Sequence, residues 1–243
     1  MQVPFTLRDI FKVFSLSLLL FLALTLLFEA LPEAANALEG FHPTLSFLVQ
    51  YLIQFVILFF PLWILVVDKY NVSLADFGFQ KIKPWLLIKT VLLCYGFYLL
   101  VSFVFAAILY YTDLNLPGYQ EQESYLPLFG YDAIGLMVAF LVISVLAPLL
   151  EELFFRGFLY RTFQKTWPIW LSSIITATLF ALIHFQLETF LPLFFLGLIL
   201  NYATQKTGSV WTSVAFHSLN NTIALTVDIY LYFHPELLEQ VLF

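Results

Sequence analysis

The sequence is dominated by long apolar runs that are separated by short polar connections. Seven of these runs are long enough to cross a hydrocarbon core of about 30 Å as helices, which takes about 20 residues. They cover residues 11–28, 45–67, 90–111, 133–150, 167–187, 189–205 and 207–227. The pattern predicts an all-α fold, a polytopic transmembrane helical bundle of about seven or eight helices.

Composition points to the same class of protein. Hydrophobic residues make up 62% of the 243 positions and charged residues 11%, whereas soluble domains carry about 25% charge. No Ser/Gly/Pro-rich linker or low-complexity tract interrupts the chain, so we expect residues 1–243 to form a single integral membrane domain. The net charge of −6 argues against nucleic acid as a partner, because proteins that bind it present basic surfaces. The single cysteine, Cys94, leaves no disulfide framework.

The basic residues predict the orientation of the bundle. All ten fall on one side of an alternating seven-helix trace, and the connections on the other side contain none. By the positive-inside rule the N-terminus is predicted to be cytoplasmic and the C-terminus extracytoplasmic.

The N-terminal run has a second interpretation, a cleavable signal peptide. Arg8 and Lys12 precede the apolar run, and the small-residue sequence Ala35-Asn36-Ala37 follows it. The length of the run and the acidic residues before Ala35 favour a retained first helix, and cleavage would not change the orientation of the other six.

A charged cluster ends the fourth apolar run. Glu151, Glu152 and Arg156 follow the uncharged residues 133–150. Ionised groups at membrane depth are costly and mostly functional, although charges that only flank a span are also common. On a helix Glu152 and Arg156 are placed to pair, while Glu151 points about 100° away and stays free. Because Pro148 has no N–H for the carbonyl of Ser144, we expect a kink there.

Two of the four histidines lie inside apolar runs, each in a recognisable spacing. His184 ends the sequence Phe-x-x-x-His, and His217 begins His-x-x-x-Asn, which ends at Asn221. Either histidine alone would be unremarkable as a satisfied packing residue. The two spacings together make both histidines candidates for a polar site inside the membrane.

Helix geometry predicts that these residues meet the carboxylates. A hairpin that turns at Trp167-Pro168 brings Glu151 and His184 level, each about 24 Å from the turn. A break at Gly208 puts His217 about 14 Å from its own turn, so the depths agree if residues 154–173 project about 10 Å further into the cytoplasm. We therefore expect the site to lie in the inner part of the membrane, in a cavity that admits water.

The order Glu-Glu-x-x-x-Arg, Phe-x-x-x-His, His-x-x-x-Asn on three helices resembles the CPBP family. This family comprises the type II CAAX prenyl endopeptidases and bacteriocin-processing intramembrane proteases, and is also called the Abi family. The resemblance covers residues 133–228, including the turn Thr207-Gly208-Ser209, and marks this region as the expected catalytic core. The signatures of zincins, of intramembrane aspartyl proteases and of rhomboid-like serine proteases do not occur in the sequence.

The resemblance implies an intramembrane endopeptidase and a role for each motif residue. Glu151 corresponds to the general base that activates water, and His184 holds the same water. Glu152 and Arg156 correspond to the supporting pair, and His217 and Asn221 to the groups that stabilise the oxyanion. Amide hydrolysis needs such a base and such donors. The family implies a bacterial plasma membrane and a peptide or protein substrate, lipidated or not. Where relatives often carry a small residue, this chain has Asn201, whose role is open.

Three alternatives use the same residues. Glu151, His184 and His217 are an acceptable zinc ligand set. We favour a metal-free site because Glu152, the carboxylate nearest to orient an imidazole, is expected to be occupied by Arg156. A non-catalytic membrane scaffold or immunity protein would use the cavity to bind a partner. A proton-relaying transporter fits less well, because the chain has no internal repeat.

Overall fold

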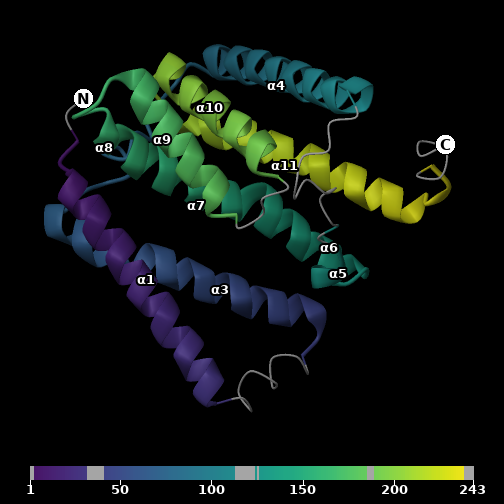
Figure 1. Cartoon of the computed structure of the whole chain (residues 1–243), viewed down its shortest axis with the longest axis horizontal. Coiled ribbons are helices and arrows are strands. Elements are labelled where there is room, and N and C mark those ends of the chain that lie inside the picture. The colour runs from purple at the N-terminus through teal and green to yellow at the C-terminus, as the bar shows by residue number, and fades with distance from the viewer. Residues whose placement is uncertain (1–2, 32–40, 113–123, 125, 185–188, 238–243) are drawn as a thin grey trace. The chain divides into compact units, whose positions relative to one another are not determined.

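The computed structural model describes residues 3–31, 41–112, 124, 126–184 and 189–237 (Figure 1). Each of the seven predicted spans contains a helix, so the prediction of an all-helical membrane protein is confirmed. The helices, several of them continued by π-helical segments η1 to η3, are α1 (Leu7–Ala30), α3 (Pro43–Leu62), η1 (Trp63–Asp68), α4 (Pro84–Thr112), α5 (Leu126–Phe129), α6 (Ala133–Ala139), η2 (Phe140–Leu146), α7 (Ala147–Glu152), η3 (Leu153–Tyr160), α8 (Arg161–Phe163), α9 (Ile169–Leu182), α10 (Phe190–Thr207) and α11 (Val210–Phe233).

Within the described ranges, four helical segments are long and apolar enough to cross a membrane: Leu7–Ala30, Pro43–Asp68, Pro84–Thr112 and Ala133–Phe163. Helix α9 is apolar but has only 14 residues. Among the described residues, α10 and α11 fall outside this set. They carry three of the polar residues singled out in the second half of the sequence, Asn201, His217 and Asn221.

The helix Ala133–Phe163 alternates between α and π geometry. The π-helical segments η2 and η3 lie directly before and after α7, the short α-helical stretch that carries Glu151 and Glu152. A π-helix pairs each N–H with the carbonyl five residues back, and such turns are frequent at functional sites. Sequence analysis predicted only a proline kink here, because it assumed α-helical pairing throughout.

Two helix breaks were predicted correctly to within a residue. Helix α10 ends at Gly208, which has a φ of 70° and whose N–H bonds to the carbonyl of Thr204. This is the left-handed C-cap that glycine adopts without a steric penalty. Pro168 was expected at the first position of its helix and instead lies at the N-cap of α9.

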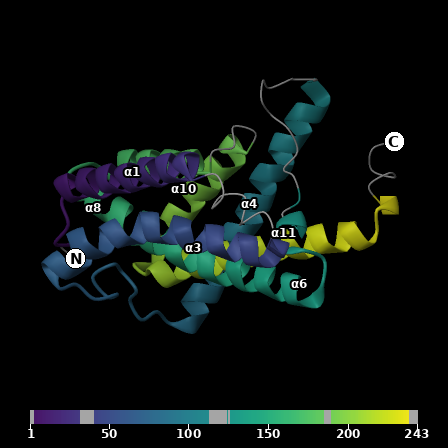
Figure 2. The ribbon, with the colours of Figure 1, turned by 90° about the horizontal axis from the view of Figure 1, so that it is seen from below.

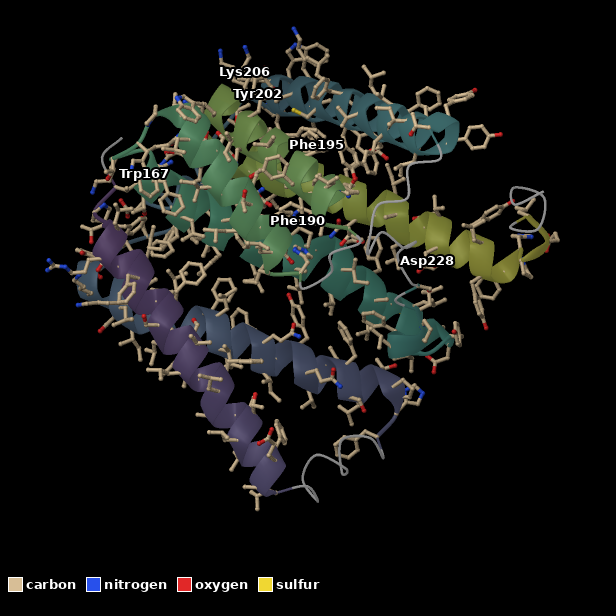
Figure 3. The ribbon with its side chains drawn as sticks, viewed as in Figure 1. Trp167, Phe190, Phe195, Tyr202, Lys206 and Asp228 are labelled. Carbon is tan, nitrogen blue, oxygen red and sulfur yellow. The ribbon has the colours of Figure 1, made fainter. Side chains whose placement is uncertain are left out.

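The chain divides into two compact units. The first comprises residues 1–3, 74–123 and 143–227 and therefore contains α4, α7 to α10 and most of α11. Within it α10 packs against α9, η3 and α4, and α9 packs against η3. Figure 1 shows α10 between α9 and α4, and Figure 2 shows α10 and α4 again as neighbours. Figure 3 shows Phe190 at the start of α10, with Tyr202 and Lys206 near its end.

The α10–α11 turn is tied to the loop before α4. The N–H of Val210 donates to the carbonyl of Gly78 over 2.9 Å, and the hydroxyl of Ser209 donates to the carbonyl of Gln80 over 2.6 Å. A Cβ at Gly157 would lie 2.9 Å from the carbonyl oxygen of Phe77, so the same loop approaches η3 closely.

The second unit comprises residues 4–73, 124–142 and 228–243. Within it α1 packs against α3, and α3 packs against α5. Asp9 is buried in the first turn of α1, where it forms a capping box with Thr6 and an ion pair of 2.7 Å with Lys69. That ion pair raises the pKa of Lys69 above its ordinary value. The Ala35-Asn36-Ala37 sequence lies outside the described residues, and the single-domain organisation stays a prediction.

Candidate active site

The predicted ion pair between Glu152 and Arg156 is confirmed, and it is fully buried. Arg156 Nη1 donates to Glu152 Oε1 over 2.8 Å, and neither side chain has any solvent exposure. Both residues follow the apolar end of the long helix at the four-residue spacing that places them on one face. Isolated ions would be very costly to bury, so each charge here depends on its partner.

The guanidinium of Arg156 is held on all sides. Its Nε donates to Asn201 Oδ1 over 3.2 Å and its Nη2 to the carbonyl of Gly197 over 3.1 Å, both on α10. Its Cζ lies 4.6 Å from the centre of the Phe180 ring on α9, a cation–π contact. Three helical segments of the first unit thus fix one side chain.

His217 lies between the two glutamates. Its Nδ1 is 2.9 Å from Glu152 Oε1, and its Nε2 is 4.0 Å from Glu151 Oε2. Because a carboxylate only accepts hydrogen bonds, the short contact places a proton on Nδ1 and directs Nε2 toward Glu151. His217 is buried, and its position on α11 brings the third motif to the first.

Glu151 differs from Glu152 in both exposure and pairing. Its side chain is 29% exposed, yet its Oε2 atom is buried and makes no hydrogen bond with the described part of the chain. The prediction that Glu151 points away from the Glu152–Arg156 pair agrees with this geometry. The chain therefore presents one shielded, charge-balanced carboxylate and one that reaches solvent.

His184 lies at the end of α9, where its Nδ1 is 2.7 Å from the carbonyl oxygen of Phe180. A carbonyl accepts only, so the proton is on Nδ1 and Nε2 is an acceptor. The Phe180 ring packs against both imidazoles, with its centroid 4.9 Å from the centroid of the His184 ring and 5.7 Å from that of the His217 ring. Among the described residues, the ion pairs of the glutamates are with His217 and Arg156, and none is with His184.

Asn221 lies one turn after His217 on α11, and its Nδ2 donates to the carbonyl of Ile143 over 3.0 Å. Sequence analysis expected Pro148 to leave the carbonyl of Ser144 unpaired. In the π-helical pattern of η2 the missing N–H of Pro148 belongs instead to the carbonyl five residues back, which is Ile143. The carbonyl of Ile143, which receives no hydrogen bond from Pro148, thus accepts one from Asn221 and orients its side chain.

The possible zinc ligands, Glu151, His184 and His217, do not form a group that could hold a metal ion within the described ranges. One argument made against zinc was nevertheless wrong. Glu152 Oε1 accepts from Arg156 and His217 at once, so Arg156 does not prevent Glu152 from orienting an imidazole. A carboxylate oxygen has two lone pairs, which is why it serves both donors.

Several residues that build this site had no role assigned from the sequence. Gly197 and Ser173 were not singled out, Phe180 entered only as the first residue of Phe-x-x-x-His, and the role of Asn201 was left open. The Gly-x-x-x-Asn spacing of residues 197 and 201 was the available signal, since small and amide residues at this interval mark helix contacts in membranes.

Comparison with known proteins supports the resemblance seen in the motifs. Residues 133–223 match the family described as "Type II CAAX prenyl endopeptidase Rce1-like". An uncharacterized 24.3 kDa protein of Escherichia coli is 35% identical over 94 residues, which cover 37% of this chain and 43% of that protein. YdiL of Bacillus subtilis (strain 168), which bears a provisional name as a membrane peptidase, is 21% identical over 112 residues, 46% of this chain and 45% of that protein.

The chain thus aligns with less than half of the length of these curated relatives. YyaK of the same Bacillus strain, also uncharacterized, is 33% identical over 98 residues, 36% of this chain and 32% of that protein. No solved structure matches the chain. The resemblance predicted from the three motifs is confirmed, and residues 133–223, which carry both glutamates, both histidines and Asn221, match the Rce1-like family of type II CAAX prenyl endopeptidases.

Proposed function

We propose that this chain is an intramembrane endopeptidase in which Glu151 is the general base for water. The observation that carries the proposal is the arrangement around His217, whose Nδ1 contacts the buried Glu152 and whose Nε2 faces the partly exposed Glu151 at 4.0 Å. A water could bond to both His217 Nε2 and Glu151 Oε2 at about 2.8 Å. The angle between these two atoms at the water oxygen would then be about 90°, which is acceptable hydrogen-bond geometry.

The two histidines take different roles in this mechanism. His184 presents Nε2 as an acceptor, so it can accept a hydrogen bond from the hydrogen of the attacking water that Glu151 does not remove. His217 suits the oxyanion when it carries both protons, because its Nε2–H is then a donor beside Glu151. The charges of Glu152 and Arg156 cancel, which reduces the cost of burying them. Asn221 supplies its second amide N–H to the same oxyanion.

The test of this function is a comparison of membranes that contain wild-type protein or Glu151→Gln. Glutamine keeps the size of glutamate but is no base, so new N-termini produced by the enzyme should disappear in the variant, while folding and substrate binding persist. N-terminal proteomics of the two membranes measures this. Identical N-terminal profiles would contradict the endopeptidase and leave a scaffold that binds a partner in the same cavity.

We propose a metal-free reaction, and chelation tests this separately. We expect activity to survive chelation, and purified protein to carry zinc below one ion per chain by elemental analysis. Stoichiometric zinc whose removal and return switch activity off and on would overturn the proposal. His217→Asn adds a second measurement, because an amide still donates to an oxyanion but is a poor zinc ligand.

The substrate in this proposal is a peptide or protein cleaved near the cytoplasmic surface of a bacterial plasma membrane. The one-sided placement of the ten basic residues supports a cytoplasmic site. The family description names prenylated CAAX peptides, and we propose peptide hydrolysis without committing to a lipid on the substrate. Nucleic acid is not expected as a partner.

A further inference from the structure

We propose that Asn201 is a positioning residue that keeps His217 directed at Glu151 by fixing Arg156. The inference rests on the proposed function for its link to catalysis. Its structural part concerns only a chain of hydrogen bonds within the first unit, and is testable without any substrate.

The chain of contacts begins on α9. Asn201 is fully buried, and its Nδ2 donates to the carbonyl of Ser173 over 3.0 Å while its Oδ1 accepts from Arg156 Nε over 3.2 Å. Both ends of the amide are therefore hydrogen-bonded, the nitrogen to the backbone of α9 and the oxygen to a buried guanidinium. Exchange of the oxygen and nitrogen would put donor against donor at Arg156 and acceptor against acceptor at Ser173, so this amide orientation is fixed by its neighbours.

Asn201 reaches Ser173 because α9 and α10 approach closely one turn away. A Cβ at Gly197 would lie 3.0 Å from both Cα and Cβ of Ala177. Asn201 lies four residues after Gly197 on α10, and Ser173 lies four residues before Ala177 on α9. The two helices are thus antiparallel in this register, and the glycine contact sets the distance that the amide spans.

The contacts continue from Arg156 to the site. Arg156 Nη1 and His217 Nδ1 both donate to Glu152 Oε1, over 2.8 Å and 2.9 Å. A guanidinium is planar, so fixing its Nε and Nη2 edges also fixes where Nη1 meets the carboxylate. The position of Glu152 then fixes the ring of His217, and with it the direction of Nε2. Asn201 touches none of the groups proposed to react, and acts through Arg156 and Glu152.

Three variants of the full-length protein test this inference. Asn201→Leu is similar in shape but loses both hydrogen bonds. Asn201→Asp keeps an oxygen for Arg156, loses the donor to Ser173 and replaces the amide by a carboxylate. Thr204→Ala is the matched control, because Thr204 is also buried on α10 but makes no contact in this chain of hydrogen bonds.

The structural readout is the imidazole nitrogen spectrum of protein labelled with ¹⁵N-histidine in detergent. Only four histidines are present, and His217→Gln identifies the signal of His217. We expect Asn201→Leu to lose the hydrogen-bonded Nδ1 proton of His217, and Asn201→Asp and Thr204→Ala to retain it. A folded Asn201→Leu protein with the wild-type His217 signal would overturn the inference. If Asn201→Leu does not fold, Asn201→Asp decides, since loss of the His217 signal in that variant would overturn it equally.

The catalytic readout is turnover of a peptide that spans a cleavage site found by the Glu151→Gln comparison. Displacement of a reacting group by about 1 Å costs about 100-fold in rate, so we expect kcat of Asn201→Leu to fall at least tenfold with little change in KM, and Asn201→Asp to recover most of it. A purely structural role would lower the melting temperature and leave kcat of the folded protein unchanged. If Glu151→Gln changes no N-terminus, the proposed function fails, while the histidine spectrum still tests the position of His217.

Discussion

Glu152 is the residue on which the other ionisable groups of the site depend. It is completely buried, and one of its oxygens accepts from Arg156 and His217 together. Its role therefore differs from that of Glu151, although the two are adjacent in sequence. The helix separates them by about 100°, so that one turns into the protein and the other toward solvent.

Removal of Arg156 should destabilise the protein as well as inactivate it. Arg156→Ala leaves the Glu152 carboxylate buried with one cationic partner fewer, which costs about 3–5 kcal/mol in comparable buried pairs. Thermal unfolding in detergent measures the loss. The double variant Glu152→Leu, Arg156→Met is the control, because it removes both charges, and should regain stability without activity. Wild-type stability of Arg156→Ala would show that the buried pair contributes nothing.

At the scale of helices, the contact between α9 and α10 sets the geometry of the site. The residues that fix Arg156 lie on these two helices, and their register depends on the approach of Gly197 to Ala177. A methyl group at Gly197 has no room, whereas Gly96 on α4 has no atom within 4 Å of its Cβ position. The two glycines therefore provide a matched pair for substitution.

Gly197→Ala should lower stability by about 1–3 kcal/mol, the usual cost of overpacking. Gly96→Ala should be neutral or slightly stabilising, because alanine favours a helix by up to about 1 kcal/mol over glycine. The second-site change Ala177→Gly should restore part of the stability of Gly197→Ala by removing one of the two atoms in conflict, the Cβ of residue 177. Equal melting temperatures for the two single variants would refute the close contact between α9 and α10.

These comparisons also indicate what a sequence predicts at this scale. The Glu152–Arg156 pair was predictable because four residues of one helix fix their own geometry. The breaks near Pro168 and at Gly208 were predictable from local chemistry. The Asn201–Ser173 contact was not, because the register between two helices depends on packing at Gly197. The Ile143–Asn221 contact was missed because its pairing follows π-helical rather than α-helical spacing.

For the whole molecule, the distribution of charge is the feature with the widest reach. The chain has ten basic and sixteen acidic residues, yet every basic residue falls on the side that alternation of the predicted spans makes cytoplasmic. The four long apolar helices in the described part of the chain support an integral membrane protein. The orientation itself is a prediction that reporter fusions test.

A reporter fused after Phe243 should respond as extracytoplasmic, and one inserted in residues 68–83 as cytoplasmic. The reason is the absence of Lys and Arg from the connections on the first side and their concentration on the second. Paired phosphatase and fluorescent-protein fusions at the same positions measure both outcomes. The reverse pattern would place the proposed active site on the other side of the membrane.

The two π-helical segments that flank α7 have a consequence for how chains of this kind vary in length. A π-turn amounts to an α-helix that holds one inserted residue, so η2 and η3 are places where the long helix accommodates an extra residue on either side of the carboxylates. Deletion of one residue in η2 together with its π-turn would leave the rotational phase of α7 unchanged, whereas a deletion where the helix has regular α geometry would turn the residues that follow by about 100°. The rotational phase of the glutamates is thus set by residue count as much as by residue type.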